Sequence, residues 1–240
     1  MIRGIYTNSS AMQYLQEKMD VVANNVANST TNGFKRSGLF QDQLMGAEQA
    51  NNRNKIQQAL PEGEIKTYVE FTQGGSIATN NKLDFSIGGD GFFSIQTPNG
   101  TAYTRDGQFT VNQEGVLVTA SGYPVLGKAG QINVQGEKIS VSEEGIISID
   151  GTEVNKFDMK SFDIKQGEQR EDNLWITKNQ EVEVKDANPQ IRQGYLETSN
   201  VSIVKEMVDM IAIQRWYQAN ERSIRTNDDA LNKAVNQIAR

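Results

Sequence analysis

The sequence predicts an α+β protein with a long helix at each end of the chain and an all-β antiparallel domain looped out between them. Two observations support this class: apolar residues recur every seven positions in both terminal segments, and short alternating runs separated by glycine turns fill the middle. We expect an N-terminal core helix over 1–36, a linker over 37–64, a central β domain over 65–192 and a C-terminal core helix over 193–240. The two helices are expected to pair as a coiled-coil core.

The N-terminal helix is expected from about residue 3 to about residue 29. Its apolar heptad positions are filled by Ile5, Met12, Leu15, Met19, Val22 and Val26, and Asn8 interrupts the pattern. A seam with this spacing is typical of a helix that packs along a second helix. Asn32-Gly33 predicts the stop, because glycine is favoured just past helix ends.

The stretch ANNVANSTTNGFKR, residues 23–36, is unusual for the end of such a helix. It contains Asn24, Asn25 and Asn28, although asparagine is a poor helix former because its amide competes for nearby backbone groups. We expect the intervening alanines to permit close backbone approach and the amides to hydrogen-bond the backbones and side chains of packed neighbours. The alternative interpretation is a frayed helix end.

The C-terminal helix repeats the pattern at greater length. Its seven-residue series is Ile203, Met210, Tyr217, Ile224, Leu231 and Ile238, and its companion series is Met207, Gln214, Glu221, Asp228 and Val235. Further apolar residues give the first half of this helix two apolar faces, which require more than one neighbour. Thr198, Ser199 and Asn200 are suitable N-cap residues for it.

The middle of the chain has the pattern of an antiparallel β domain. Short alternating runs extend from about residue 65 to about residue 185. The turn dipeptides between them are Asp90-Gly91, Asn99-Gly100, Asp106-Gly107, Glu114-Gly115 and Asp150-Gly151. The preceding segment 37–60 is rich in Gln and Asn, so we expect a linker that is flexible in the free chain.

Composition excludes several classes of site. The 240 residues include no Cys and no His, which removes disulfides, thiol nucleophiles, Cys/His zinc sites and the usual general base near neutral pH. Residues 37–199 carry 14 basic and 23 acidic side chains, which argues against nucleic-acid binding. No apolar run is long enough to insert in a membrane, and MIRGIYTNSS lacks the apolar core of a cleavable signal peptide.

Candidate catalytic and ligand-binding motifs are weak. SIGGDGFF, residues 86–93, does not fit a dinucleotide fingerprint and is better explained as a hairpin turn. Asp84, Asp90 and Asp106 could form a carboxylate pair for glycoside hydrolysis, but two of them precede glycine in turns. SEEGIISIDG, residues 142–151, lacks the oxygen spacing of a calcium loop. We therefore expect no enzyme activity, no cofactor and no metal.

Three blocks, in order and spanning nearly the whole chain, resemble the rod and hook axial proteins of the bacterial flagellum. They are MDVVANNVANSTTNGFKR (19–36), LDFSIGGDGFFSIQTPNGTAYTRDGQFTVNQEGVLVTASGYPVLG (83–127) and QGYLETSNVSIVKEMVDMIAIQRWYQANERSIRTNDDALNKAVNQI (193–238). The resemblance implies a structural subunit of the basal-body rod, the drive shaft for motility, which polymerises helically through its terminal helices. GYPVLG and IRQGYLE look most like the proximal (F-type) rod protein, whereas MIRGIYT suits the distal (G-type) equally.

The resemblance also implies partners and a location. The partners would be copies of the chain, other rod and hook subunits and the flagellar type III export machinery, with surrounding ring proteins possible. The location would be the basal body within the cell envelope and periplasmic space, with no membrane insertion. The expected assembly interface comprises Ile5, Met12, Leu15, Met19, Val22, Asn24, Asn25, Asn28, Ile203, Met207, Met210, Tyr217, Ile224 and Leu231. Two alternatives from other classes stay open: a carboxylate-dependent cell-wall hydrolase and a β-rich adhesin with a helical stalk.

Overall fold

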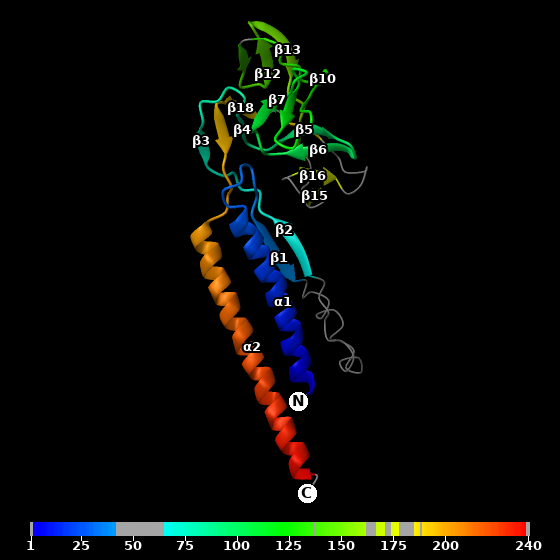
Figure 1. Ribbon diagram of the computed structural model, residues 1–240, viewed down its shortest axis with the longest axis vertical. Coiled ribbons are helices and arrows are strands. Elements are labelled where there is room, and N and C mark those ends of the chain that lie inside the picture. Colours follow the sequence, from blue (N-terminus) through cyan, green and yellow to red (C-terminus); the bar gives the residue numbers. More distant parts are fainter. Residues whose placement is uncertain are drawn as a thin grey trace, which may run out of the picture. The chain divides into compact units, whose positions relative to one another are not determined.

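The structure, a computed structural model, describes residues 2–41, 65–136, 138–161, 167–170, 174–177, 185–187 and 189–238. The chain divides into two compact units. The helical unit comprises Met1–Ala27, Ser37–Glu70 and Ser202–Arg240, and the β unit comprises Asn28–Arg36 and Phe71–Val201. The predicted α+β class, with a helix at each end and a central antiparallel β-rich region, is confirmed (Figure 1).

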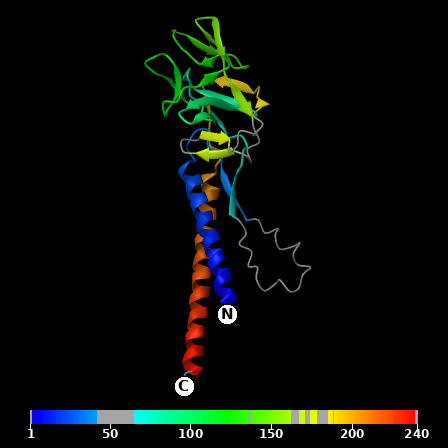
Figure 2. The same ribbon diagram turned by 90° about the vertical axis from the view of Figure 1, so that its right-hand side faces the viewer.

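The helical unit contains two helices and a two-stranded ribbon. Helix α1 (Ile2–Ala27) and helix α2 (Ile203–Ile238) lie side by side in both ribbon views (Figure 1, Figure 2). Strands β1 (Ser37–Gln41) and β2 (Ile65–Val69) pair antiparallel. The predicted linker over 37–64 therefore begins with a strand, and its residues 42–64 lie outside the described part of the chain.

The described helix ends can be compared with the prediction. Helix α1 ends at Ala27, about two residues before the predicted end near residue 29. Asn28 closes a turn there: its carbonyl accepts from the Thr31 N–H at 3.1 Å and its Oδ1 accepts from Thr31 Oγ1 at 3.2 Å. Helix α2 begins at Ile203, so the proposed N-cap residue Asn200 lies too early. Asn200 Oδ1 instead accepts from the Arg36 N–H at 2.7 Å.

The β unit is built from antiparallel ladders throughout its described strands. One sheet has six strands in the order β15-β16-β6-β5-β14-β17, a second has the order β11-β12-β13, and four two-stranded sheets pair β18 with β4, β19 with β3, β7 with β8 and β10 with β9. The strands are β3 (Ser76–Ala78), β4 (Phe85–Gly88), β5 (Phe92–Thr97), β6 (Gly100–Thr104), β7 (Phe109–Val111), β8 (Leu117–Thr119), β9 (Leu126–Gly127), β10 (Gly130–Gln131), β11 (Ile139–Val141), β12 (Ile146–Ile149), β13 (Thr152–Lys156), β14 (Met159–Ser161), β15 (Gly167–Arg170), β16 (Leu174–Thr177), β17 (Lys185–Asp186), β18 (Gln190–Gln193) and β19 (Tyr195–Glu197).

Glycine turns set the hairpins of the β unit, as the sequence predicts. Between β12 and β13, Asp150 and Gly151 both have positive φ, at 52° and 87°. This combination suits a two-residue hairpin turn whose twist matches that of the strands. Gly107 serves a different purpose, because a Cβ there would collide with the Phe85 carbonyl oxygen.

The core of the β unit is centred on packed phenylalanine rings. Phe157 packs against Phe85 and Phe93 with ring centroids 5.3 and 5.2 Å apart, and Phe93 packs edge-on against Phe109 at 5.2 Å. All four side chains are buried. Such aromatic pairs contribute about 0.5–1.5 kcal/mol each beyond the apolar area that they bury. The described residues of this unit therefore form an apolar core of their own.

Candidate assembly interface

The helices of the helical unit contact each other through a short apolar seam. Leu15 and Val22 of α1 and Ile213 of α2 are buried against one another, with Met19 and Met210 packed partly buried at their side. In an antiparallel pair, side chains three and four residues apart on one helix fill the spaces on the other. The seam holds the two ends of the chain together within this unit.

Two side-chain hydrogen bonds define the antiparallel register. Asn8 Nδ2 donates to Ser223 Oγ at 3.1 Å, and Asn25 Nδ2 donates to Glu206 Oε2 at 3.2 Å. Seventeen residues separate the two members on each helix, so the register is constant along the pair. Continued to the start of α1, it places Ile2 opposite Asp229, and the last turns of α2 extend past that point (Figure 1).

The predicted interface residues have different surroundings. Leu15 and Val22 are buried, Met12, Met19, Met210 and Ile224 are half-buried, and Ile203, Met207 and Tyr217 are exposed. Of the predicted asparagines, Asn25 is buried, Asn28 is half-buried and Asn24 is exposed. The side chains of Ile5 and Leu231 lie outside the described residues. Whether the described positions contact other subunits stays a prediction.

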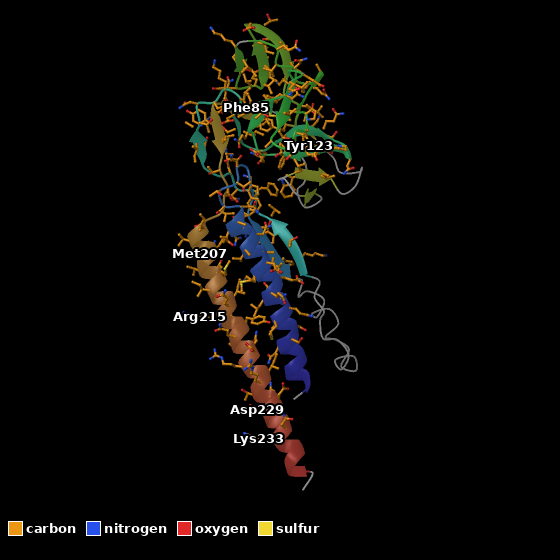
Figure 3. The ribbon with its side chains drawn as sticks, in the orientation of Figure 1. Phe85, Tyr123, Met207, Arg215, Asp229 and Lys233 are labelled. Carbon is orange, nitrogen blue, oxygen red and sulfur yellow. The ribbon has the colours of Figure 1, made fainter. Side chains whose placement is uncertain are left out.

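The seven-residue pattern missed two members of the seam. Glu206 and Ile213 are 0% and 1% exposed, whereas Met207, in the expected companion series, is 53% exposed (labelled in Figure 3). Glu206 lies four residues before Met210 and Ile213 lies three residues after it. Residues spaced three and four apart share one face of a helix, so the spacing of the true seam was present in the sequence. The isoleucine could have been found this way; the glutamate could not, because a carboxylate gives no apolar signal.

A second apolar face of α2 is open to solvent. Ile203, Val204, Met207, Val208 and Ile211 are each between 42% and 74% exposed. At about 100° per residue, this face is centred roughly 140° around the helix from the buried seam. A contiguous exposed apolar surface on one side of a helix marks an interaction site. The predicted second face of the first half of α2 is therefore present as a surface.

Asn25 is the asparagine of the ANNVAN stretch with the best-defined contacts. Its Oδ1 accepts from the Ser37 N–H at 2.9 Å, while Nδ2 donates to the Ser37 carbonyl at 2.8 Å and to Glu206 at 3.2 Å. The amide thus pairs with the backbone of β1 as a strand residue would. These hydrogen bonds join the amide to the backbone of β1 and to a side chain of α2 within the same chain, and whether it also meets another subunit stays a prediction.

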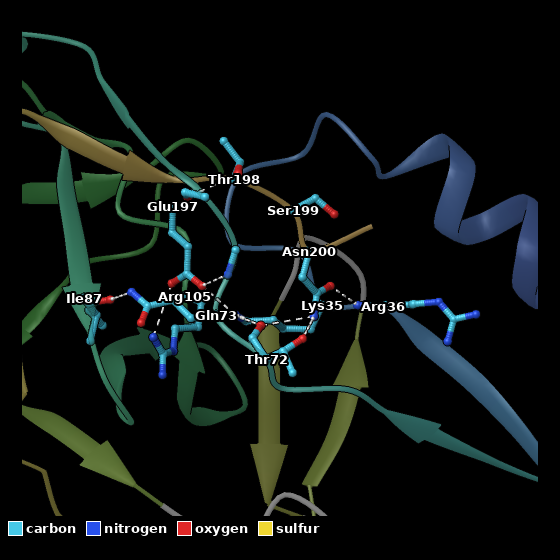
Figure 4. Close-up of polar contacts among 12 residues, drawn as sticks. Lys35, Arg36, Thr72, Gln73, Ile87, Arg105, Glu197, Thr198, Ser199 and Asn200 are labelled. Atoms are coloured by element: carbon cyan, nitrogen blue, oxygen red, sulfur yellow. Dashed lines mark hydrogen bonds and ion pairs between the residues drawn. The ribbon is translucent and has the colours of Figure 1, made fainter. Parts of the chain in front are cut away.

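A buried ion-pair cluster fastens the ends of the β unit together (Figure 4). Glu197 Oε1 accepts from Lys35 Nζ at 2.5 Å and from the Gly74 N–H at 3.0 Å, while Oε2 accepts from Arg105 Nη1 at 3.2 Å. Lys35 Nζ also donates to the Thr72 carbonyl at 3.0 Å. One carboxylate therefore joins segments that are far apart along the chain.

The cluster is electrostatically costly to assemble. Burial lowers the pKa of Lys35 from its ordinary value, and the hydrogen bond and charge of Glu197 oppose that shift. Burial likewise lowers the pKa of Arg105, again against the charge of Glu197. The guanidinium of Arg105 also lies 5.3 Å from the ring centroid of Phe92. Both cations receive charge compensation from the same carboxylate, and Arg105 also donates to the Gly89 carbonyl at 2.7 Å.

The carboxylates considered for catalysis have local structural roles. Asp84 Oδ1 accepts from the side-chain amide of Asn81 at 3.0 Å. Asp106 Oδ1 accepts from the Gln108 N–H at 3.0 Å, as turn-forming aspartates do. Burial raises the pKa of Asp106 above its ordinary value. Among the described residues, no group of three acidic side chains could hold a metal, and no helix is long and apolar enough to cross a membrane.

Comparison with known proteins identifies a family over most of the chain. Residues 5–35 match the family described as flagella basal body rod protein, residues 86–149 match the flagellar hook protein FlgE/F/G D1 domain, and residues 192–238 match the flagellar basal body rod FlgEFG protein C-terminal region. These three matches fall on the same blocks that carry the sequence resemblance.

Full-length relatives agree. The chain is 34% identical to flagellar basal-body rod protein FlgG of Buchnera aphidicola subsp. Schizaphis graminum, covering 97% of this chain and 98% of the relative. It is 33% identical to FlgF of Rhizobium meliloti, covering 98% and 97%, and 33% identical to FlgG of Bacillus subtilis, covering 98% and 99%. The chain belongs to the flagellar basal-body rod protein family, as a structural subunit of that rod.

Proposed function

We propose that this chain builds the rod by helical polymerisation through its two terminal helices. The helices pair as a coiled-coil core, and the exposed apolar face of α2 packs on neighbouring rod or hook subunits. The observation that carries this proposal is that face: Ile203, Val204, Met207, Val208 and Ile211 are exposed together on one side of α2. Burying each such side chain contributes about 1.5–3 kcal/mol.

The position of that face favours an open assembly. It lies on α2 well away from the seam with α1, so covering it leaves the pairing of the helices intact. A surface that binds a different surface of the next copy forms a heterologous interface, and repetition of an interface that does not close yields a helical filament. Because the two helices are already paired within each subunit, assembly costs less conformational entropy than it would if the helices had to become ordered at the same time.

Finer features of the function are part of the same proposal. We place the chain in the proximal rod, with the distal rod as the alternative, because GYPVLG and IRQGYLE look most like the proximal type. The chain reaches the periplasmic part of the basal body through the flagellar type III export machinery, where ring proteins surround it. Cryo-microscopy of basal bodies carrying a tagged copy distinguishes the two rod positions.

The direct test replaces an apolar residue of the exposed face by a charge. Val208→Asp is expected to abolish rod assembly and motility, because Val208 is 60% exposed and its loss leaves the seam untouched. Gln218→Asp, at an exposed polar position of the same helix, is the matched control and should leave motility unchanged. Normal rods in Val208→Asp would exclude the face from assembly.

We further propose that the chain acts without catalysis. Asp84 is hydrogen-bonded to the side chain of Asn81 and Asp106 to the backbone of its own turn, which supports a structural role. Incubating the purified protein with cell-wall material tests the hydrolase alternative. Release of fragments that Asp84→Ala or Asp106→Ala abolishes would establish catalysis.

A further inference from the structure

A polar pair interrupts the apolar seam of the helical unit at its end nearest the β1 strand. Asn25 and Glu206 are both 0% exposed, and their side chains hydrogen-bond across the two helices at 3.2 Å. Burying polar groups in a helix interface lowers stability relative to well-packed apolar residues. Their best-attested benefit in paired helices is to specify one register over the alternatives.

The helix pair needs such a device because its two helices differ in length. Helix α1 has 26 residues and α2 has 36. In the observed register α2 extends beyond the residue opposite Ile2. If α1 slid by seven residues toward the C-terminus of α2, every residue of α1 would therefore still lie beside a residue of α2. The slipped register would again supply apolar partners, since Trp216 and Tyr217 would replace Asp209 and Met210 at the level of Val22.

The slipped register would nevertheless separate the polar pair. Asn25 would then lie opposite Ile213 rather than Glu206, and one amide N–H of Asn25 would lose its acceptor inside the seam. An unsatisfied buried donor costs about 1–3 kcal/mol. The slip would also shift α2 by about 10 Å along α1, because each residue of a helix rises 1.5 Å.

We propose that Asn25 and Glu206 are the register-setting pair of the terminal helices. They are positioning residues: they place the exposed apolar face of α2 at a fixed height relative to α1, so that successive subunits meet in the same way. The Ser37 backbone, held by the same Asn25 amide, extends this alignment to β1. The inference rests on the proposed helix pairing in the assembled rod.

The absence of cysteine from the sequence makes the register measurable by disulfide cross-linking. Asn8→Cys with Ser223→Cys reports the observed register, because the two side chains are hydrogen-bonded at 3.1 Å. Asn8→Cys with Ala230→Cys reports the slip of seven residues. Each pair is introduced into the full chain, expressed in place of the original gene, and oxidised in isolated basal bodies. Intramolecular bridges are recognised by their faster-migrating monomer band.

Glu206→Leu and Glu206→Gln are the matched variants. Glutamine keeps an acceptor oxygen for the amide of Asn25, so it should retain the wild-type preference for the 8–223 bridge. Leucine removes the acceptor and leaves the contacts between Asn25 and Ser37 in place. The ratio of the 8–230 bridge to the 8–223 bridge is expected to rise about tenfold in Glu206→Leu relative to Glu206→Gln.

An equal ratio in the two variants would overturn the register assignment while leaving helix pairing established. Failure of the unsubstituted chain to form the 8–223 bridge would instead overturn the helix pairing itself, and with it this inference. If Glu206→Leu forms neither bridge, the double variant Asn25→Leu/Glu206→Leu tests the register assignment instead. In this variant the seam is apolar at both positions of the polar pair, so no buried amide lacks an acceptor. An increased 8–230 fraction in the double variant supports the assignment, and an unchanged preference for 8–223 refutes it.

Discussion

Among the described residues, 14 buried side chains form one apolar cluster in the β unit, whereas Leu15, Val22 and Ile213 are the fully buried apolar members of the helix seam. The first half of α2 meanwhile exposes side chains as large as Met207 and Trp216. A unit that has buried its apolar surface can fold without neighbours, while one that has not gains stability from association. We therefore expect the β unit to fold autonomously, and the proposed assembly to involve the helical unit.

The largest expected effect tests whether the two units are separable. Met210→Asp places a carboxylate beside the buried seam, which costs several kcal/mol, and should abolish rod assembly and motility. The β unit should keep its unfolding midpoint, measured by the fluorescence of buried Trp175 in a Trp216→Phe background. Met210→Leu is the control and should remain motile. A shifted midpoint for Trp175 would show that the units fold as one.

The next prediction tests how much the buried ion-pair cluster contributes to the stability of the β unit. Glu197→Leu leaves Lys35 and Arg105 buried without their shared carboxylate, so the free energy of unfolding should fall by about 3–5 kcal/mol. Glu197→Gln retains an acceptor and should lose less. Urea denaturation followed by Trp175 fluorescence measures both. A loss below about 1 kcal/mol in Glu197→Leu would mean that the cluster contributes little to the unit.

The smallest effect concerns the pH dependence of the β unit. Because burial raises the pKa of Asp106 above 3.8, the folded state holds this proton more tightly than the unfolded state does. The contribution of Asp106 to the free energy of unfolding is therefore fully present below its pKa in the unfolded state. It is lost as the pH rises through its pKa in the folded state. Asp106→Asn, which keeps an acceptor for the Gln108 N–H, should be slightly more stable than the original at pH 7.

The difference between Asp106→Asn and the original should shrink below about pH 4, where the aspartate is protonated in both states. Urea denaturation at both pH values checks this. A stability difference that is independent of pH would contradict the assignment to Asp106.

Sequence periodicity predicted the elements better than their contacts. Alternation and glycine turns located the strands of the β unit, because a period of two and positive φ are local properties. The heptad pattern located Leu15, Val22 and Met210 but missed Ile213, because several seams fit a helix that has two apolar faces. Glu197 was not predicted, since its partner Lys35 is 162 residues away and neither residue belongs to a local pattern.

The stretch ANNVANSTTNGFKR was the clearest sequence anomaly and was explained only in part. Its packing role was predicted, but the partners of Asn25 are β1 and α2 of the same chain. Lys35, at the end of the same stretch, is 1% exposed, although lysine is normally a surface residue. Local composition indicates that such residues are constrained, while the identity of their partners depends on the three-dimensional fold.

The unequal lengths of the two helices make the helical unit polar along its axis. Near Glu206 the pair ends with both helices and the start of β1 joined by one amide, while past Asp229 the described part of the pair consists of α2 alone. The two ends of the unit are therefore chemically unlike. A shaft built by stacking such units inherits that direction, so its two tips differ and subunits adding to them meet different surfaces.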